Sequence, residues 1–302
     1  MPAIGKVTNE TLRGIVLREL DWKEHDKLLT VLTREHGRIL VTAHGVKSMR
    51  NKNLAISQLF AYSEMQLTKR GDRWTLQEGS LLESFYLLRE NLDSLTFAQY
   101  ACEVCAEAAA EEIEDEAGVQ QLLLNTLYVA QFQRDIPHLK AAFELRLCAI
   151  SGFLPELGAC TTCGKRRPAA GSPACDPAAD LPASDGWRFD CIGGGLICPD
   201  CHGEKEHEER TVAGMKGERY YPSPSRIPLD EPCLTALRYV CFADGKRLFS
   251  FTLPDRSALY FRYLCERFLL DQFERGYKTL EFYHELFLPG TRQGLPPPGV
   301  KL

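Results

Sequence analysis

Two Cys-x-x-Cys pairs constrain the fold of this chain more than any other feature of its sequence. Cys160 and Cys163 form the first pair, and Cys198 and Cys201 form the second. Glycine follows each pair within two residues, which suits the tight turns of zinc knuckles. Two facing knuckles place four sulfurs around Zn²⁺ as a tetrahedron. The long spacer between the pairs is rich in Pro and Ala and cannot supply an apolar core. We therefore predict a structural zinc ion in its place.

Other interpretations of the cysteines remain open. Cys175 and Cys191 are spare thiols, and Cys191 is able to replace one of the four ligands. Cys102 and Cys105 also form a Cys-x-x-Cys pair, but they lie on the apolar stripe of an expected helix, where buried thiols are common. No apolar run resembles a signal segment or a membrane span, so we expect a soluble, cytoplasmic chain whose 12 cysteines stay reduced.

A catalytic zinc site is the alternative from the enzyme class. The segment at 207–209 reads His-Glu-Glu and contains the His-x-Glu of zinc deaminases. It follows the cysteine pairs instead of preceding them, and the Pro-Cys-x-x-Cys signature is missing. We favour a structural ion and no enzymatic activity.

Short apolar runs, two of them alternating with polar residues, predict strands in the first eighty residues. They lie at 12–20, 27–33, 38–42, 64–68 and 73–77, with Gly71-Asp72 as a hairpin signal. Five strands in this length suit a small closed barrel. An OB-fold and an SH3-like barrel both fit the pattern, and we favour the OB-fold.

Helical periodicity begins near residue 92. Apolar residues recur at spacings of three and four in 95–109, 119–130 and 139–150, and Pro137 suits a first helical turn. Further helices are expected at 234–242 and around 261–268, where Gly276 is a candidate terminator. The predicted fold class is α+β and multidomain: a barrel at 1–82, an α-helical domain at 83–157 and 205–302, and a zinc-binding insertion with four cysteine ligands at 158–204.

Charge is distributed unevenly along the chain. The net charge is −5, yet residues 1–80 hold 13 Lys/Arg against 9 Asp/Glu, and no acidic residue lies between Glu35 and Glu64. Cations on the loops of a small barrel are typical of proteins that bind a phosphate backbone. Solvated loop charge is the alternative. The candidate DNA-binding residues are Arg38, Lys47, Arg50, Lys52, Lys69, Arg70 and Arg73. Phe60, Tyr62 and Trp74 are candidate stacking partners, with the barrel core as the alternative place for each of them.

Six short segments, in this order and spacing, resemble the RecO family of bacterial recombination mediators. They are RGIVL at 13–17, DKLLT at 26–30, TREHGR at 33–38, FELRL at 143–147, GFLP at 152–155 and GGGL at 193–196. The resemblance covers essentially the whole chain. It implies an N-terminal OB-fold, a helical C-terminal domain and a zinc-binding insertion.

The same resemblance implies partners and a role. RecO proteins bind single-stranded and double-stranded DNA and anneal complementary strands. They act with RecR and RecF to load RecA on DNA coated by single-stranded DNA-binding protein, whose C-terminal tail they contact. By position, Arg38, Lys47, Arg50 and Lys52 match the family's DNA-facing surface, and a place at the bacterial nucleoid follows. Lys140 and Arg146 are candidates for the tail contact by charge alone. An interaction scaffold that never touches DNA is a third interpretation.

Overall fold

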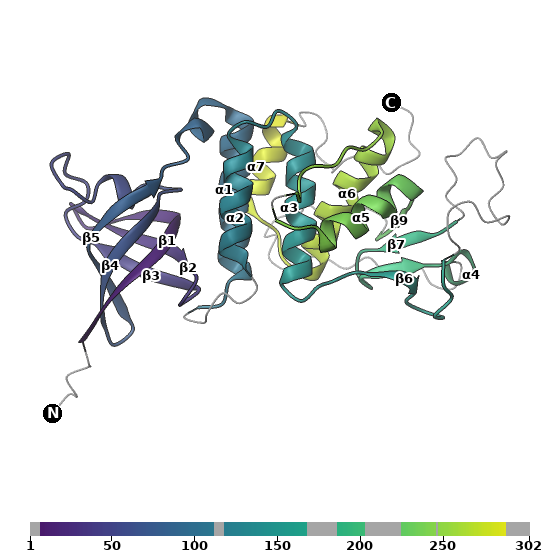
Figure 1. The fold of residues 1–302 in the computed structure, drawn as a ribbon, viewed down its shortest axis with the longest axis horizontal. Coiled ribbons are helices and arrows are strands. Elements are labelled where there is room, and N and C mark those ends of the chain that lie inside the picture. Colours follow the sequence, from purple (N-terminus) through teal and green to yellow (C-terminus); the bar gives the residue numbers. More distant parts are fainter. Residues whose placement is uncertain (1–6, 112–117, 168–185, 203–224, 246, 288–302) are drawn as a thin grey trace. The chain divides into compact units, whose positions relative to one another are not determined.

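The computed structural model describes residues 7–111, 118–167, 186–202, 225–245 and 247–287 (Figure 1). The chain divides into two compact units, Met1–Gln133 and Arg134–Leu302. The segment at 207–209, Cys175 and the Pro-rich stretch at 296–298 lie outside the described residues. Among the helices that are described, none combines the length and the apolar character needed to cross a membrane.

Five strands close a barrel in the first unit, in the order β1-β2-β3-β5-β4. They are β1 (Val7–Trp22), β2 (Asp26–Thr33), β3 (Arg38–Ala43), β4 (Tyr62–Arg70) and β5 (Arg73–Glu83). Neighbouring strands are antiparallel except β3 and β5, which pair in parallel at Val41–Trp74 and Thr42–Thr75. A closed five-stranded barrel followed by helices confirms the predicted fold class, with the OB-fold as its first part.

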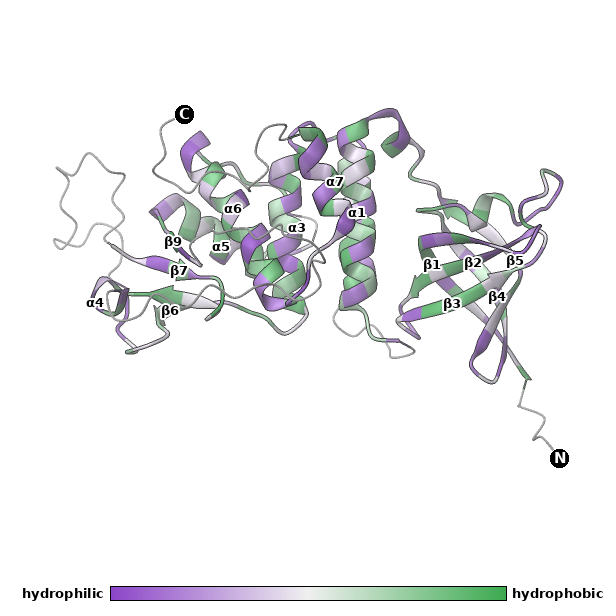
Figure 2. Ribbon diagram, turned by 180° about the vertical axis from the view of Figure 1, so that it is seen from behind, coloured by the Kyte–Doolittle hydropathy of each residue, from purple (hydrophilic) through white to green (hydrophobic). Residues whose placement is uncertain are grey.

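Period-two alternation explains why these segments form the barrel. Inward side chains such as Leu29, Val31, Val41 and Leu67 fill its core. The barrel strands carry both hydrophobic and hydrophilic residues along their length (Figure 2). Gly79 lies where β5 crosses β4 so closely that a Cβ would stand 2.6 Å from the carbonyl oxygen of Glu64.

Two helices complete the first unit. α1 (Leu92–Ala108) is capped by the side chain of Asn91, and α2 (Val119–Ala130) follows it. Short 3-10 turns, η1 (Ala55–Ser57) and η2 (Tyr86–Glu90), lie in the connections. The buried side-chain amide of Gln120 donates to the carbonyl oxygens of Leu32, at 2.7 Å, and Arg13, at 3.1 Å. This amide ties α2 to two barrel strands.

The second unit is built on helices α3 (Ile136–Ile150), α5 (Glu231–Phe242), α6 (Asp255–Gln272) and α7 (Lys278–Phe287). Pro137 occupies the first turn of α3, as predicted, and Asp135 caps that helix. α6 ends at Gln272, four residues before the expected terminator Gly276, and Glu274 already takes the left-handed conformation, with φ +49°. The pattern analysis does not predict α7.

A small four-stranded sheet carries the cysteines, in the order β6-β8-β7-β9. Its strands are β6 (Glu156–Cys160), β7 (Arg188–Asp190), β8 (Gly195–Ile197) and β9 (Arg226–Pro228), and the short helix α4 (Pro199–His202) follows β8. The division into three parts at 1–82, 83–157 with 205–302, and 158–204 stays a prediction. The two compact units of the structure meet after Gln133.

Candidate metal centre and nucleic-acid interface

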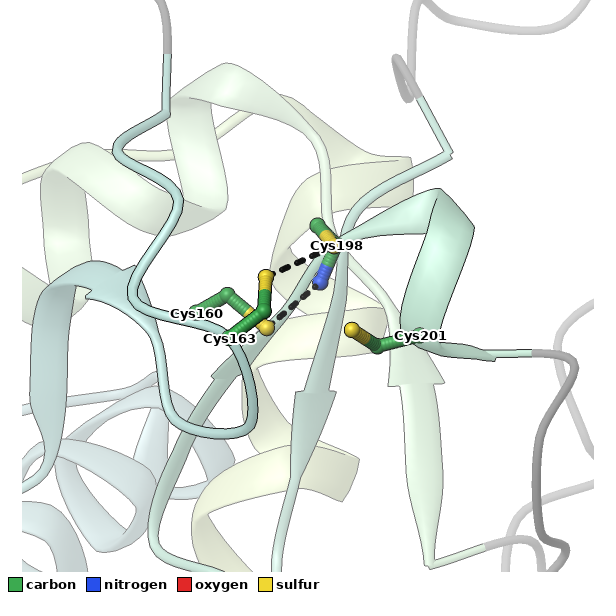
Figure 3. A group of neighbouring side chains, drawn as sticks. All are labelled: Cys160, Cys163, Cys198 and Cys201. Atoms are coloured by element: carbon green, nitrogen blue, oxygen red, sulfur yellow. Dashed lines mark hydrogen bonds between the residues drawn. The ribbon is translucent and has the colours of Figure 1, made fainter.

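The small sheet brings all four predicted cysteines together. β6 and β8 are parallel, so Cys160 at the end of β6 and Cys198 just after β8 leave the sheet at the same edge. Cys163 follows in the turn after β6, and Cys201 lies on α4. The four Sγ atoms lie within 4.8 Å of one another (Figure 3).

The spacing of the sulfurs fits a tetrahedral ion. Sulfurs held about 2.3 Å from a central Zn²⁺ stand roughly 3.8 Å apart. The Sγ atoms of Cys163 and Cys198 are 3.6 Å apart, and the backbone N–H of Cys198 points at Cys160 Sγ from 3.4 Å (Figure 3). Gly164 adopts φ +73°, a left-handed conformation that lets its N–H return to the carbonyl oxygen of Cys160. The turn is that of a zinc knuckle.

The electrostatics of the cluster favour a cation. Burial alone would raise the pKa of Cys160, but backbone N–H groups of Cys198, Cys163 and Thr162 lower it to about 6. Hydrogen bonds to the sulfurs of Cys163 and Cys198 raise the pKa of Cys201. Four thiolates this close together would repel one another, and a bound cation would offset that repulsion.

The remaining described cysteines stay apart from this cluster. Cys191 is fully buried, and burial raises the pKa of its thiol. Cys102 and Cys105 are buried in α1, as their place on the apolar stripe predicted. Within the described residues, the four sulfurs of Cys160, Cys163, Cys198 and Cys201 make up the metal-competent group.

The sheet is anchored to α6 as well as to the cysteines. Phe189 of β7 packs edge-on against Phe268, with ring centroids 5.3 Å apart. The side-chain amide of Gln272 donates to the carbonyl oxygens of Cys191 and Ile192 at 2.8 and 3.1 Å. Contacts with α6 therefore hold the sheet on the helices, and the four sulfurs lie together where β6 and β8 end.

Three of the seven predicted DNA-binding residues are ion-paired. Arg38 Nη2 lies 2.9 Å from Glu111 Oε1, and Lys47 Nζ lies 3.2 Å from Asp21 Oδ1. Lys52 pairs with Glu78. These carboxylates offset part of the positive potential that the sequence suggested. The sequence pattern did not reveal these ion pairs, because the two members of each pair are at least 26 residues apart in the chain.

The structure places the other four candidate DNA-binding residues in different surroundings. Lys69 places its ammonium 4.8 Å from the centroid of the Trp74 ring. Arg50, Arg70 and Arg73 are exposed, and no acidic side chain among the described residues pairs with them. They retain their full charge for an anionic ligand.

The candidates do not all lie at one place on the barrel. Arg70 is paired in the ladder with Val7, the first residue of β1, and Arg73 faces it across the β4–β5 turn. Lys47 contacts Asp21 close to the last residue of the same strand. Arg70 and Arg73 therefore lie near the first residue of β1, and Lys47 lies near its last.

The structure places two further sets of candidate residues inside the protein. Trp74 and Phe60 are buried in the barrel and cannot stack on a ligand; of the three proposed aromatics only Tyr62 is partly exposed. Lys140 is buried between two carboxylates, and Arg146 donates to the carbonyl oxygen of Cys241. Both cations serve the helical core, so their charge no longer marks them as contacts for an acidic tail.

Comparison with known proteins places the chain in a family. Residues 7–85 match the family model described as "Recombination protein O N terminal", and residues 89–215 match "Recombination protein O C terminal". A "DNA repair protein RecO" of Symbiobacterium thermophilum is 34% identical over 202 residues, which cover 67% of this chain and 74% of that protein. The chain belongs to the RecO family.

Other RecO proteins match over longer stretches. The "DNA repair protein RecO" of Acetivibrio thermocellus is 25% identical over 274 residues, covering 90% of this chain and 95% of that protein. The Bacillus subtilis protein of the same name is 27% identical over 275 residues, covering 86% and 93%. The resemblance inferred from six short segments is confirmed, and the chain is a member of a family of DNA repair proteins.

Proposed function

We propose that this chain is a non-catalytic recombination mediator whose barrel binds the DNA backbone. It binds single-stranded and double-stranded DNA and anneals complementary strands. With RecR and RecF it helps to load RecA on DNA coated by single-stranded DNA-binding protein, whose C-terminal tail it contacts. Membership of the RecO family supports this role. The observation that carries it is a set of exposed arginines on a closed five-stranded barrel, without acidic partners in the described part of the chain: Arg50, Arg70 and Arg73.

Annealing by such a surface needs no active-site chemistry. Two complementary strands repel each other through their phosphates, and cations that neutralise phosphates release condensed counterions. The strands then approach, and base pairing supplies the specificity. Exposed arginines in two parts of the barrel suit this task, because Arg50 in the β3–β4 loop and Arg70 and Arg73 beside the β4–β5 turn can hold different stretches of backbone.

Zinc in this account is structural. Four thiolates complete the tetrahedron of Zn²⁺ and leave no open position for water or substrate, unlike a catalytic site with three protein ligands. When bound, the ion joins the two knuckles, which the ion pair of Lys165 with Asp200 also links at 2.7 Å. The proposed role of the metal is thus to hold the edge of the sheet.

Charge removal tests DNA binding by the barrel. The triple variant Arg50→Ala, Arg70→Ala, Arg73→Ala is expected to bind single strands more weakly, with the slope of log K against log salt flatter by about two units, since each lost contact removes about 0.7. Fluorescence anisotropy of a labelled oligonucleotide at several salt concentrations gives this slope.

The ion-paired residues supply the matched control. The variant Arg38→Ala, Lys47→Ala, Lys52→Ala removes the same charge, yet it should flatten the slope by less than half as much, because carboxylates already compensate these cations. An unaltered slope in a folded Arg50, Arg70 and Arg73 variant would exclude the barrel from DNA binding.

A further inference from the structure

The outward face of β1, β2 and β3 displays apolar side chains that the barrel core does not use. Trp22 is 51% exposed, Leu40 51% and Leu20 43%. Trp22 and Leu20 are two residues apart on β1 and so share a face, and Leu28 of β2 stands opposite Leu20. Leu28 is paired in turn with Thr42 of β3, which lies two residues from Leu40 on the same strand. The face is therefore continuous over three strands.

Trp22 is held in place by the neighbouring loop. Its two neighbours in the chain, Asp21 and Lys23, both contact the ammonium of Lys47, which lies 3.2 Å from Asp21 Oδ1 and 3.2 Å from the carbonyl oxygen of Lys23. The backbone N–H of Lys47 also donates to the carbonyl oxygen of His25. The β1–β2 turn is thus fixed against the β3–β4 loop, and the indole projects from a rigid support.

The charges around this face suit a polyanion. Arg18 lies on the same side of β1 as Leu20 and Trp22, and among the described residues it has no acidic partner. Arg73 directly precedes Trp74, whose partner on β3 is Val41, next to Leu40. Of the acids near Trp22, Asp21 contacts Lys47, Asp26 contacts His44 at 2.9 Å, and the exposed Glu24 lies 3.8 Å from His25. Arg18 is opposite Thr30, which is opposite Leu40, so Arg18 and Arg73 flank Leu40. Leu20 and Trp22 extend the apolar face along β1 from Arg18, as bases extend along a strand beside its phosphates.

We propose that Trp22, with Leu20 beside it, is the surface on which unpaired bases of a single-stranded nucleic acid stack. Arg18 and Arg73 at the margin of the face then contact the phosphates on either side. This inference rests on the proposed DNA-binding function. It names the residue that makes the protein bind single strands in preference to duplex DNA. Stacking on an aromatic ring needs bases with a free face, which a duplex does not offer in its interior.

The tryptophan content of the chain makes the proposal directly measurable. The chain has three tryptophans. Trp74 is 1% exposed and Trp187 is 2% exposed, so Trp22 is the tryptophan that a ligand can reach. A stacked base quenches indole emission. Binding of an oligothymidylate to the full-length protein should therefore quench the fluorescence of the exposed indole, and Trp22→Phe should abolish that quenching.

Affinity measurements complete the test. Trp22→Ala is expected to bind the labelled oligothymidylate about tenfold more weakly, as loss of one base stack implies, with an unchanged salt slope because no phosphate contact is lost. Trp22→Phe should retain affinity within about threefold, and duplex affinity should stay the same in both variants. Tyr86→Ala removes an exposed aromatic of η2 and is the matched control, with no effect expected.

The outcomes distinguish this inference from the function on which it rests. If the wild-type protein binds the oligonucleotide in the anisotropy assay without quenching, or if Trp22→Ala binds it normally, the stacking role is wrong while DNA binding stands. Normal DNA binding by Trp22→Ala together with loss of a protein partner would make the face a protein interface. If the wild-type protein binds no oligonucleotide at low salt, the proposed function itself fails.

Discussion

Cys198→Ser is expected to empty the metal centre and open the edge of the small sheet. Cys198 is fully buried, its backbone N–H points at Cys160, and its Sγ lies 3.6 Å from Cys163 Sγ. Loss of an outer-shell partner alone weakens metal affinity about 10- to 100-fold, so loss of a ligand should exceed a hundredfold. Purified protein should fall from about one zinc ion per chain to near none, as measured by mass spectrometry of metal content.

The structural consequence should be large but local. Zinc binding contributes about 10–16 kcal/mol to the folding of isolated zinc fingers, where no other core exists. Here Phe189 and Gln272 also hold the sheet on α6, so part of it should survive. We expect hydrogen exchange to accelerate in β6 and β8 while the barrel strands stay protected. DNA binding should remain near the wild-type level, because the barrel belongs to the other compact unit.

Cys191→Ser is the matched control for this experiment. It makes the same chemical change at a fully buried thiol that lies outside the cluster of four sulfurs. It should keep its zinc, with only a small loss of stability from a polar group in an apolar site. Zinc retained by a natively folded Cys198→Ser protein, or lost by Cys191→Ser, would contradict the assignment of the four ligands.

Local patterns explain why the barrel and the cysteine ligands were predictable. Alternation with a period of two places successive side chains on opposite faces of a strand. Apolar residues such as Val31 and Val41 therefore mark the buried face of their strands within a few residues of sequence. The knuckles are equally local, since each joins two cysteines and a glycine within a few residues. Their meeting was inferred because a lone knuckle cannot complete a tetrahedral site.

Long-range contacts explain what was not predictable. Arg38 pairs with Glu111, 73 positions away, and a charge count along the sequence gives no sign of it. Strands β8 and β9 have three residues each, too few to show a period. α7 left a detectable signal, since Leu280 and Tyr283 are three apart on its buried side. Trp22 was overlooked because its exposure depends on where the strand ends.

The helical core contains a buried lysine between two carboxylates, which the periodicity of apolar residues does not reveal. α3 is buried on almost every side, so its pattern does not separate a core-facing stripe from a solvent face. Lys140 is 5% exposed, and its ammonium lies 2.7 Å from Glu144 Oε1 and 2.6 Å from Glu266 Oε2. Burial alone would lower the pKa of Lys140, but the two carboxylates raise it above its ordinary value. The i, i+4 spacing of Lys140 and Glu144 is the one sequence signal of this pair.

Lys140→Met is therefore expected to cost about 3–5 kcal/mol of unfolding free energy, because two carboxylates lose the cation that compensates them in the core. Urea unfolding followed by circular dichroism at 222 nm measures this loss. Changing Glu144 and Glu266 to Gln in the same chain should restore most of the stability, since uncharged groups no longer require the ammonium. Lys165→Met breaks an exposed pair with Asp200 and should leave the transition nearly unchanged.

The pH dependence separates lost charge compensation from lost packing. In the wild-type protein, burial would raise the pKa of Glu266, but Lys140 and His284 lower it below its ordinary value. This carboxylate therefore stabilises the fold above the unfolded pKa of about 4.3, and its contribution is lost as the pH falls through the folded pKa. In Lys140→Met the carboxylates of Glu144 and Glu266 become harder to ionise, so the folded state takes up protons and the variant should gain stability between pH 7 and pH 5. A stability loss that is the same at both pH values would mean that Lys140 contributes only packing.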